Sequence, residues 1–186
     1  SPARDFIREH IPVDAQVFNT FDQGSRYLCW FYPERLPFID GNGDGYPPEF
    51  FAEYLRITNA EEAFAPYARR YGIDWVYLSL KTKLARRLYM SAAWHPVYLD
   101  GDGIILVNQT PKFSELRKKF DRRADLARGH IPDWEPTPLP TFLHRTTPRG
   151  ERVLAGFLFR VGEDQAAIVA RAHARQFLPE GKGDRK

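Results

Sequence analysis

Hydrophobic positions along the chain alternate between short β-prone runs and longer amphipathic stretches. The runs Val17–Phe18, Phe38–Ile39 and Ile73–Leu80 are bounded by turn residues and predict strands. The stretch Tyr27–Phe31 lies between the first two runs and is too apolar for an exposed loop, so we expect a buried helical turn there. This order predicts a βαβ unit, whose two strands run parallel.

Apolar residues spaced three and four positions apart predict the helices. They fall at 1–10, 47–56, 61–71, 81–93, 112–130 and 151–178, the last with a break at Gly162. Two further apolar runs, Val97–Leu99 and Ile104–Asn108, are joined by the Asp-Gly pairs of Asp100–Gly103, a strong hairpin signal. The predicted fold class is therefore α/β, a small mostly parallel sheet with a C-terminal antiparallel hairpin and flanking helices, followed by a helical appendage.

Composition changes along the chain divide it into four segments. We expect an α/β domain at 1–111, a basic helix at 112–130, a proline-rich strap at 131–150 and a helical hairpin with a frayed tail at 151–186. The first segment is mildly acidic and the rest is basic, although the net charge is only +3. The basic helix can be a solvated surface or a contact for anionic lipid headgroups, whereas nucleic acid is disfavoured because no aromatic residues interleave its charges.

The polar residues that follow the first two predicted strands are the candidates for a binding site. Parallel strands end at one edge of the sheet, and ligands of open α/β sheets bind at that edge. The sequence therefore predicts ligand contacts at Asn19, Asp22, Gly24 and Asp40. No arrangement of acid, base and nucleophile is visible, so we predict no catalytic residue and leave open whether the protein is an enzyme.

The loop Asp40–Gly45 repeats part of a calcium-binding pattern. Asp40, Asn42 and Asp44 alternate and a glycine follows, as in the first half of a calcium loop. The usual bidentate glutamate is replaced by Phe51. Calcium is the only cofactor that the sequence suggests, and a plain glycine-rich turn is the alternative explanation.

The single cysteine excludes an internal disulfide framework. Because Cys29 lies in the apolar run Tyr27–Tyr32, we expect its thiol to be buried and inert.

Nineteen positions, taken in order, resemble a known family. The motif order, beginning VFN and FIDG and continuing through YGIDW to the hairpin, resembles the soluble extracytoplasmic domain that follows the membrane helices in bacterial GT-C-type glycosyltransferase-like proteins. The matching positions are Val17, Phe18, Asn19, Asp22, Gly24, Tyr27, Leu28, Trp30, Pro33, Phe38, Ile39, Asp40, Gly41, Tyr71, Gly72, Asp74, Trp94, Tyr98 and Asp100. That family usually places an arginine soon after the Asp-Gly pair, whereas this chain has Asn42-Gly43-Asp44-Gly45.

The resemblance implies a non-catalytic domain of a membrane-bound glycosyltransferase. In that family the catalytic carboxylates lie between membrane helices, so this part would support or cap the membrane active site. The implied partners are its own membrane-spanning segment, anionic lipid headgroups or a lipid-linked sugar, and the implied location is outside the cytoplasm. A calcium-stabilised binding or scaffold module, unrelated to glycosyl transfer, is the alternative.

The C-terminal segment resembles a single tetratricopeptide repeat. The positions that match its spacing are Leu154, Ala155, Leu158, Gly162, Ala167, Ala174 and Pro179. One such repeat cannot bury its own apolar face, so we expect it to dock on the α/β domain or to begin a longer array.

Overall fold

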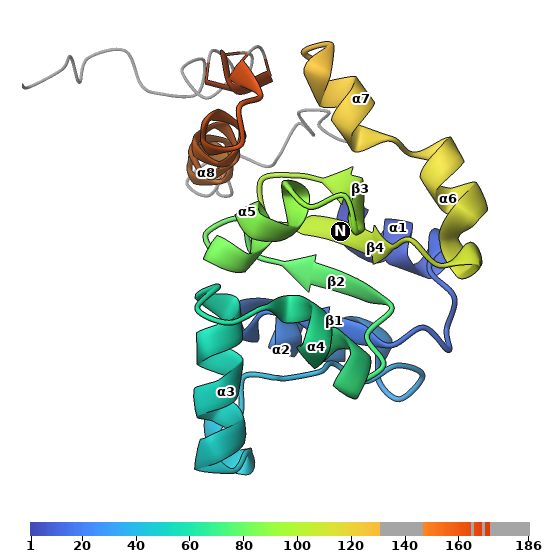
Figure 1. Ribbon diagram of the computed structural model, residues 1–186, viewed down its shortest axis with the longest axis vertical. Coiled ribbons are helices and arrows are strands. Elements are labelled where there is room, and N and C mark those ends of the chain that lie inside the picture. The colour runs from blue at the N-terminus through green and yellow to red at the C-terminus, as the bar shows by residue number, and fades with distance from the viewer. Residues whose placement is uncertain (131–146, 165, 169, 172–186) are drawn as a thin grey trace, which may run out of the picture.

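A computed structural model describes residues 1–130, 147–164, 166–168 and 170–171, and its centre is a mixed four-stranded sheet (Figure 1). The strands are β1 (Val17–Asn19), β2 (Trp75–Leu78), β3 (Trp94–Leu99) and β4 (Ile104–Asn108). Their order is β1-β2-β4-β3. Only β1 and β2 pair in parallel, whereas β4 pairs antiparallel with both β2 and β3.

The α/β class and the antiparallel hairpin are confirmed, but the mostly parallel sheet is wrong. Phe38–Ile39 forms no strand, and β1 pairs instead with β2, matching Phe18 to Val76. The side chain of Asn19 explains the difference. It accepts a hydrogen bond from the Phe38 backbone N–H at 2.8 Å and donates one to the Ile39 carbonyl at 2.6 Å, so this segment is held without a strand partner.

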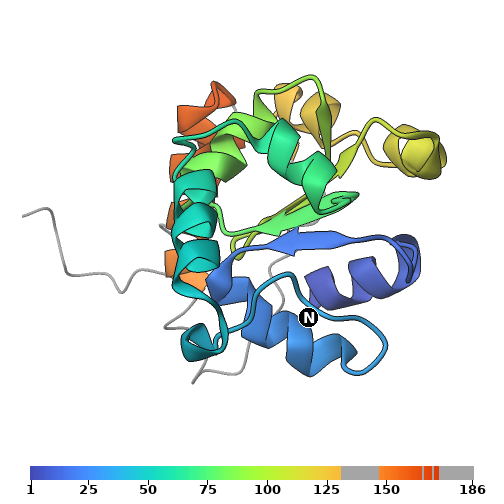
Figure 2. The ribbon, with the colours of Figure 1, turned by 60° about the horizontal axis from the view of Figure 1, so that its bottom comes forward.

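Helices cover both faces of the sheet. They are α1 (Pro2–His10), α2 (Phe21–Phe31), α3 (Pro48–Thr58), α4 (Phe64–Arg70), α5 (Lys83–Tyr89), α6 (Ser114–Lys119), α7 (Arg122–Ala127) and α8 (Thr147–Arg160), with 3₁₀ turns η1 (Gly43–Gly45) and η2 (Pro111–Phe113). In Figure 2, α1 and α2 lie below the sheet, and α4 and α5 lie above it.

Alternation along β2 builds two separate cores. Trp75 and Tyr77 point to the face covered by α1 and α2, whereas Val76 and Leu78 point to the face covered by α3, α4 and α5. All four side chains are fully buried, which explains why the sequence of this strand is apolar throughout.

The helix α2 confirms the helical segment expected between the first two apolar runs and extends it to eleven residues. The expectation for its cysteine is wrong, because Cys29 is exposed. Tyr27 and Phe31 face the core from the same helix, four residues apart, and Cys29 lies on the opposite side.

The predicted basic helix 112–130 is divided into η2, α6 and α7. The break falls at Phe120, which has an extended backbone, and Asp121 then caps α7 by accepting the Ala124 N–H. Arg122 is buried rather than facing solvent, and Arg123 donates to backbone carbonyls at the end of α5 and the start of β3. Arg117 likewise donates to the Asn108 and Thr110 carbonyls, so two of the arginines expected on a solvated surface bind the chain's own backbone.

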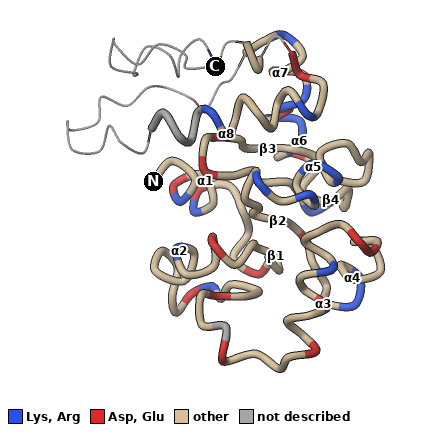
Figure 3. The backbone as a smooth tube through the Cα atoms, turned by 90° about the vertical axis from the view of Figure 1, so that its left-hand side faces the viewer, with Lys and Arg blue, Asp and Glu red and all other residues tan. Residues whose placement is uncertain are grey.

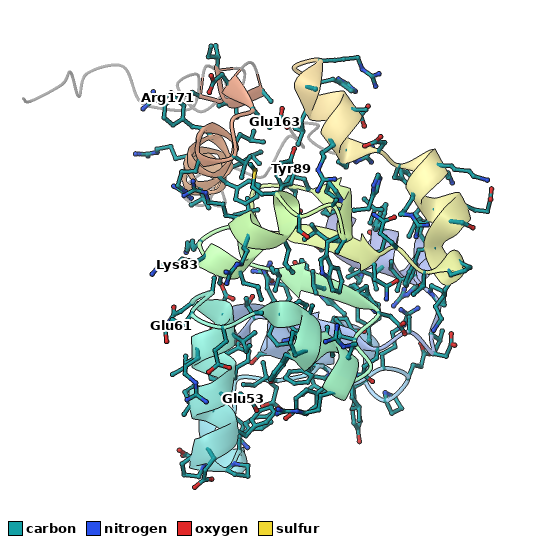
Figure 4. The ribbon with its side chains drawn as sticks, in the orientation of Figure 1. Glu53, Glu61, Lys83, Tyr89, Glu163 and Arg171 are labelled. Atoms are coloured by element: carbon teal, nitrogen blue, oxygen red, sulfur yellow. The ribbon has the colours of Figure 1, made fainter. Side chains whose placement is uncertain are left out.

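The C-terminal helical residues pack on the α/β body. Leu154, Phe157 and Leu158 of α8 are fully buried in the same core as α3, α4 and α5. The hydroxyl of Tyr89, in α5, donates to Glu163 at 2.6 Å, and these two residues lie side by side in Figure 4. Gly162 adopts a positive φ of 84° at the expected helix break.

Most of the predicted strap, residues 131–146, lies outside the described residues, as do the repeat positions Ala174 and Pro179. Within the described ranges, no helix has the length and apolar character needed to cross a membrane.

Candidate functional site

The chain segments that follow β1, β2 and β3 meet at one edge of the sheet. Since β3 runs antiparallel to β4, and β4 antiparallel to β2, the three strands point the same way. Thr20, Ser79 and Asp100 therefore follow the strands at a common edge, which is the usual position of an α/β ligand site. The Ser79 N–H donates to the Thr20 hydroxyl oxygen at 3.0 Å, joining the first two of these segments.

Three of the four predicted contact residues come together at this edge. Asn19 binds the backbone at Phe38 and Ile39, and Gly24 lies directly against the same segment. A Cβ atom on Gly24 would lie 1.9 Å from the Ile39 carbonyl oxygen and 2.8 Å from the Asp40 Cα, so only glycine permits this approach. Asn19 and Gly24 thus position the loop that begins at Asp40.

The fourth predicted contact residue, Asp22, is exposed in the first turn of α2. A carboxylate there interacts favourably with the helix dipole. Within the described part of the chain, no hydrogen bond or ion pair involves its side chain. Asp22 is thus the one predicted contact residue whose carboxylate has no structural use in this edge.

The loop Asp40–Gly45 forms a compact turn held by its own side chains. One oxygen of Asp40 accepts the Asn42 N–H at 2.9 Å and the Tyr46 hydroxyl at 3.3 Å, an Asx turn followed by η1. Asn42 and Asp44 are exposed. No three metal-ligating His, Cys, Asp or Glu side chains gather anywhere in the described ranges. The hydrogen bonds of Asp40 account for the turn, and calcium binding by Asp40, Asn42 and Asp44 stays a prediction.

The β3–β4 turn closes the same edge. One oxygen of Asp100 accepts the backbone N–H groups of Asp102 and Gly103 at 2.8 and 2.9 Å, and the other accepts the Tyr98 hydroxyl at 2.7 Å. Burial of this carboxyl raises its pKa above the usual aspartate value. The carboxyl of Asp100 is thus fully engaged in shaping the turn.

Helix α2 binds this turn through two side chains. Gln23 donates to the Asp102 carbonyl at 2.8 Å, and the Arg26 guanidinium pairs with the Asp102 carboxylate at 3.0 Å. These two side chains therefore connect α2 to the β3–β4 hairpin at this edge of the sheet.

A second feature lies beside α5, for which the sequence predicted only a helix at 81–93. A cavity of about 960 Å³ opens between the start of α5 and α8. Its lining is Leu80, Lys81, Thr82, Lys83, Arg86, Arg152, Val153, Gly156 and Arg160. The spacing of Lys81, Lys83 and Arg86 was visible in the sequence, but no local signal indicated that α8 would bring further arginines to the same place.

The chain thus forms an α/β domain with a mixed sheet. At one edge of this sheet, polar residues from the ends of the strands hydrogen-bond to the chain's own loops. No model of a known protein family matches the sequence, and no curated protein or solved structure matches it either.

Proposed function

We propose that the chain is a non-catalytic extracytoplasmic domain of a membrane-bound GT-C-like glycosyltransferase, which supports or caps the membrane active site. The hydrogen bonds at the strand-end edge of the sheet are the main support for this proposal. At the edge where an α/β enzyme directs its reacting groups at a substrate, Asn19, Thr20 and Asp100 instead bind the chain's own loops.

An edge whose polar side chains are already hydrogen-bonded to the chain suits a rigid supporting domain. General acid–base catalysis needs a side chain within hydrogen-bond reach of a substrate proton. The Asp100 carboxyl already accepts hydrogen bonds on both oxygens. The exposed Asp22 is then the candidate contact for an acceptor or a lipid-linked sugar, as expected from its position after the first strand.

The reading frame that encodes this chain gives the first test. We expect several apolar stretches of about 20 residues upstream of Ser1, each long enough for a membrane helix. A frame that encodes only polar, globular sequence on both sides would contradict the assignment to a membrane enzyme.

Kinetics of the parent protein give the second test. Asp100→Asn retains the acceptor oxygen of the turn, so we expect kcat to stay within about threefold, whereas loss of a general acid or base costs about a hundredfold or more. Asp22→Asn is expected to raise KM for the acceptor and to leave kcat nearly constant, the pattern of lost binding. A hundredfold fall in kcat for Asp100→Asn, with the fold intact, would make this edge catalytic.

A further inference from the structure

Among the residues that the structure describes, five cationic side chains and no acidic one line the cavity between α5 and α8. Lys81, Lys83 and Arg86 come from the start of α5 and the loop before it, and Arg152 and Arg160 come from α8. Figure 3 colours Lys and Arg positions on both helices, and Lys83 extends on the side of the molecule where α8 lies (Figure 4). Two segments far apart in the sequence thus place like charges around one opening.

Four of these cations are unpaired within the described part of the chain. In the described ranges, no ion pair or hydrogen bond involves the side chain of Lys81, Lys83, Arg86 or Arg160. Other exposed cations of the same body do have carboxylate partners, since Arg70 pairs with Glu53 at 2.6 Å. Like charges around one opening repel each other, and a bound anion removes that repulsion.

The helix α8 contributes a face shaped for a ligand. Arg152, Gly156 and Arg160 are spaced four residues apart and so lie on one side of the helix. A Cβ atom on Gly156 would lie 3.4 Å from Arg160 Nη1, so the glycine lets this guanidinium lie close to the helix beside the cavity. Guanidinium groups match the geometry of phosphate oxygens, and lysines add point charges.

The size of the cavity indicates which kind of anion fits into it. Its volume of about 960 Å³ lies near the upper end of the range for small-molecule sites, which is roughly 300 to 1,000 Å³. Leu80 and Val153 supply apolar lining beside the charges. The cavity therefore has room for an organic group attached to the anion, rather than for an inorganic ion alone.

We propose that this cavity binds a phosphate or diphosphate ester, with Lys81, Lys83, Arg86 and Arg160 holding the phosphate oxygens. The ester comes either from a free phosphorylated metabolite or from a lipid headgroup, because both present the same anionic oxygens. The inference does not depend on the parent protein being a glycosyltransferase.

Calorimetric titration with inorganic pyrophosphate tests the anion site directly. We expect saturable binding at one site per chain, weakened at least about tenfold by the double variant Lys83→Glu, Arg86→Glu. The matched control is Lys118→Glu, which changes the charge of an exposed lysine on α6, on the opposite side of the molecule in Figure 1. That control should bind pyrophosphate within about twofold of the wild type.

The double variant keeps its fold because both altered side chains are exposed, and its circular dichroism and unfolding midpoint check this. Arg160→Glu provides an independent variant from α8 and should also weaken binding. Absence of saturable binding, or an equal loss in Lys118→Glu, would overturn the proposal, since the second result reflects net charge alone.

Two further probes separate the sources of the ester. Uridine diphosphate in solution represents a free phosphorylated metabolite, and vesicles of phosphatidylglycerol, compared with phosphatidylcholine, represent an anionic headgroup. Binding of either probe that the double variant abolishes supports the site and assigns its source. Binding to neither probe, or binding that the double variant leaves intact, overturns it.

Discussion

The side-chain amide of Asn19 donates a hydrogen bond of 2.6 Å to the carbonyl oxygen of Ile39, twenty residues further along the chain. Its oxygen accepts the Phe38 N–H at the same time. Asn19 is fully buried, so no water replaces these partners if the amide is lost. One side chain therefore satisfies two backbone groups of a segment that has no strand partner.

Asn19→Ala is expected to lower the free energy of unfolding by about 3 kcal/mol, since a buried donor or acceptor left without a partner costs about 1 to 3 kcal/mol. Urea unfolding followed by fluorescence measures the loss. Asn42→Ala, at an exposed position of the neighbouring loop, is the control and should change stability by less than about 0.5 kcal/mol. Equal stability of the two variants would show that the Asn19 hydrogen bonds contribute little.

The error at Phe38–Ile39 shows how far the sequence determines the fold. Local signals predicted α1, α2, β2 and the β3–β4 hairpin, because apolar period and Asp-Gly turns act within a few residues. A β-prone pair such as Phe38–Ile39 does not reveal whether a strand or a side chain will satisfy its backbone. That choice depends on Asn19, and therefore on tertiary structure.

The two candidate sites also differ in whether the sequence alone could predict them. The strand-end edge was predictable because Asn19, Gly24 and Asp40 follow short apolar runs directly. The cationic cavity was not predictable, because Arg160 and Lys83 line the same cavity only when α8 packs on the α/β body. In the basic segment, charge alone could not distinguish a solvated arginine from Arg123, which donates to backbone carbonyls.

Arg123 of α7 is expected to contribute more to stability than Arg128, which lies at the C-terminal end of the same helix. Its guanidinium donates to the carbonyls of Tyr89, Ser91 and Trp94, joining α7 to the α5–β3 connection. Arg123→Met should cost about 2 kcal/mol of unfolding free energy, the usual range for hydrogen bonds from a charged group.

Arg128→Met is the matched control, because Arg128 is 70% exposed and pairs only with Asp125 in the described structure. Exposed ion pairs contribute about 0 to 1 kcal/mol, so this variant should be close to wild type. Denaturant midpoints of the two variants, measured at equal salt, check the difference. A larger loss for Arg128→Met would contradict the structural role assigned to Arg123.

If the loop Asp40–Gly45 is a plain turn, calcium is expected to leave the stability of the domain unchanged. Asp40 already accepts the Asn42 N–H and the Tyr46 hydroxyl, and Glu53, an acid near the end of the motif, pairs with Arg70. A ligand bound only by the folded state would add about 2.7 kcal/mol at a hundredfold excess over its dissociation constant. Thermal unfolding in excess calcium and in chelator measures this, and a rise abolished by Asp40→Ala and Asp44→Ala would establish the calcium site.

Acidification is expected to destabilise the domain through His10 and His95. Both imidazoles contact Phe120, His10 through its ring and His95 through the backbone carbonyl at 3.3 Å. Burial lowers the pKa of each below the ordinary value of 6.5, although Glu9 and Asp121 oppose the shift.

The sign of the effect follows from proton uptake. In the folded state both histidines stay neutral at a pH where the unfolded chain already binds protons, so stability falls as the pH drops from 6.5 toward the lowered folded pKa values. Urea unfolding midpoints between pH 7.5 and 5.5 measure how steeply the stability changes with pH. His95→Gln should flatten this slope, whereas His130→Gln, at an exposed position, should not. The raised pKa of Asp100 contributes with the opposite sign but cancels between wild type and variant, so an unchanged slope in His95→Gln would exclude His95 as a source of the acid sensitivity.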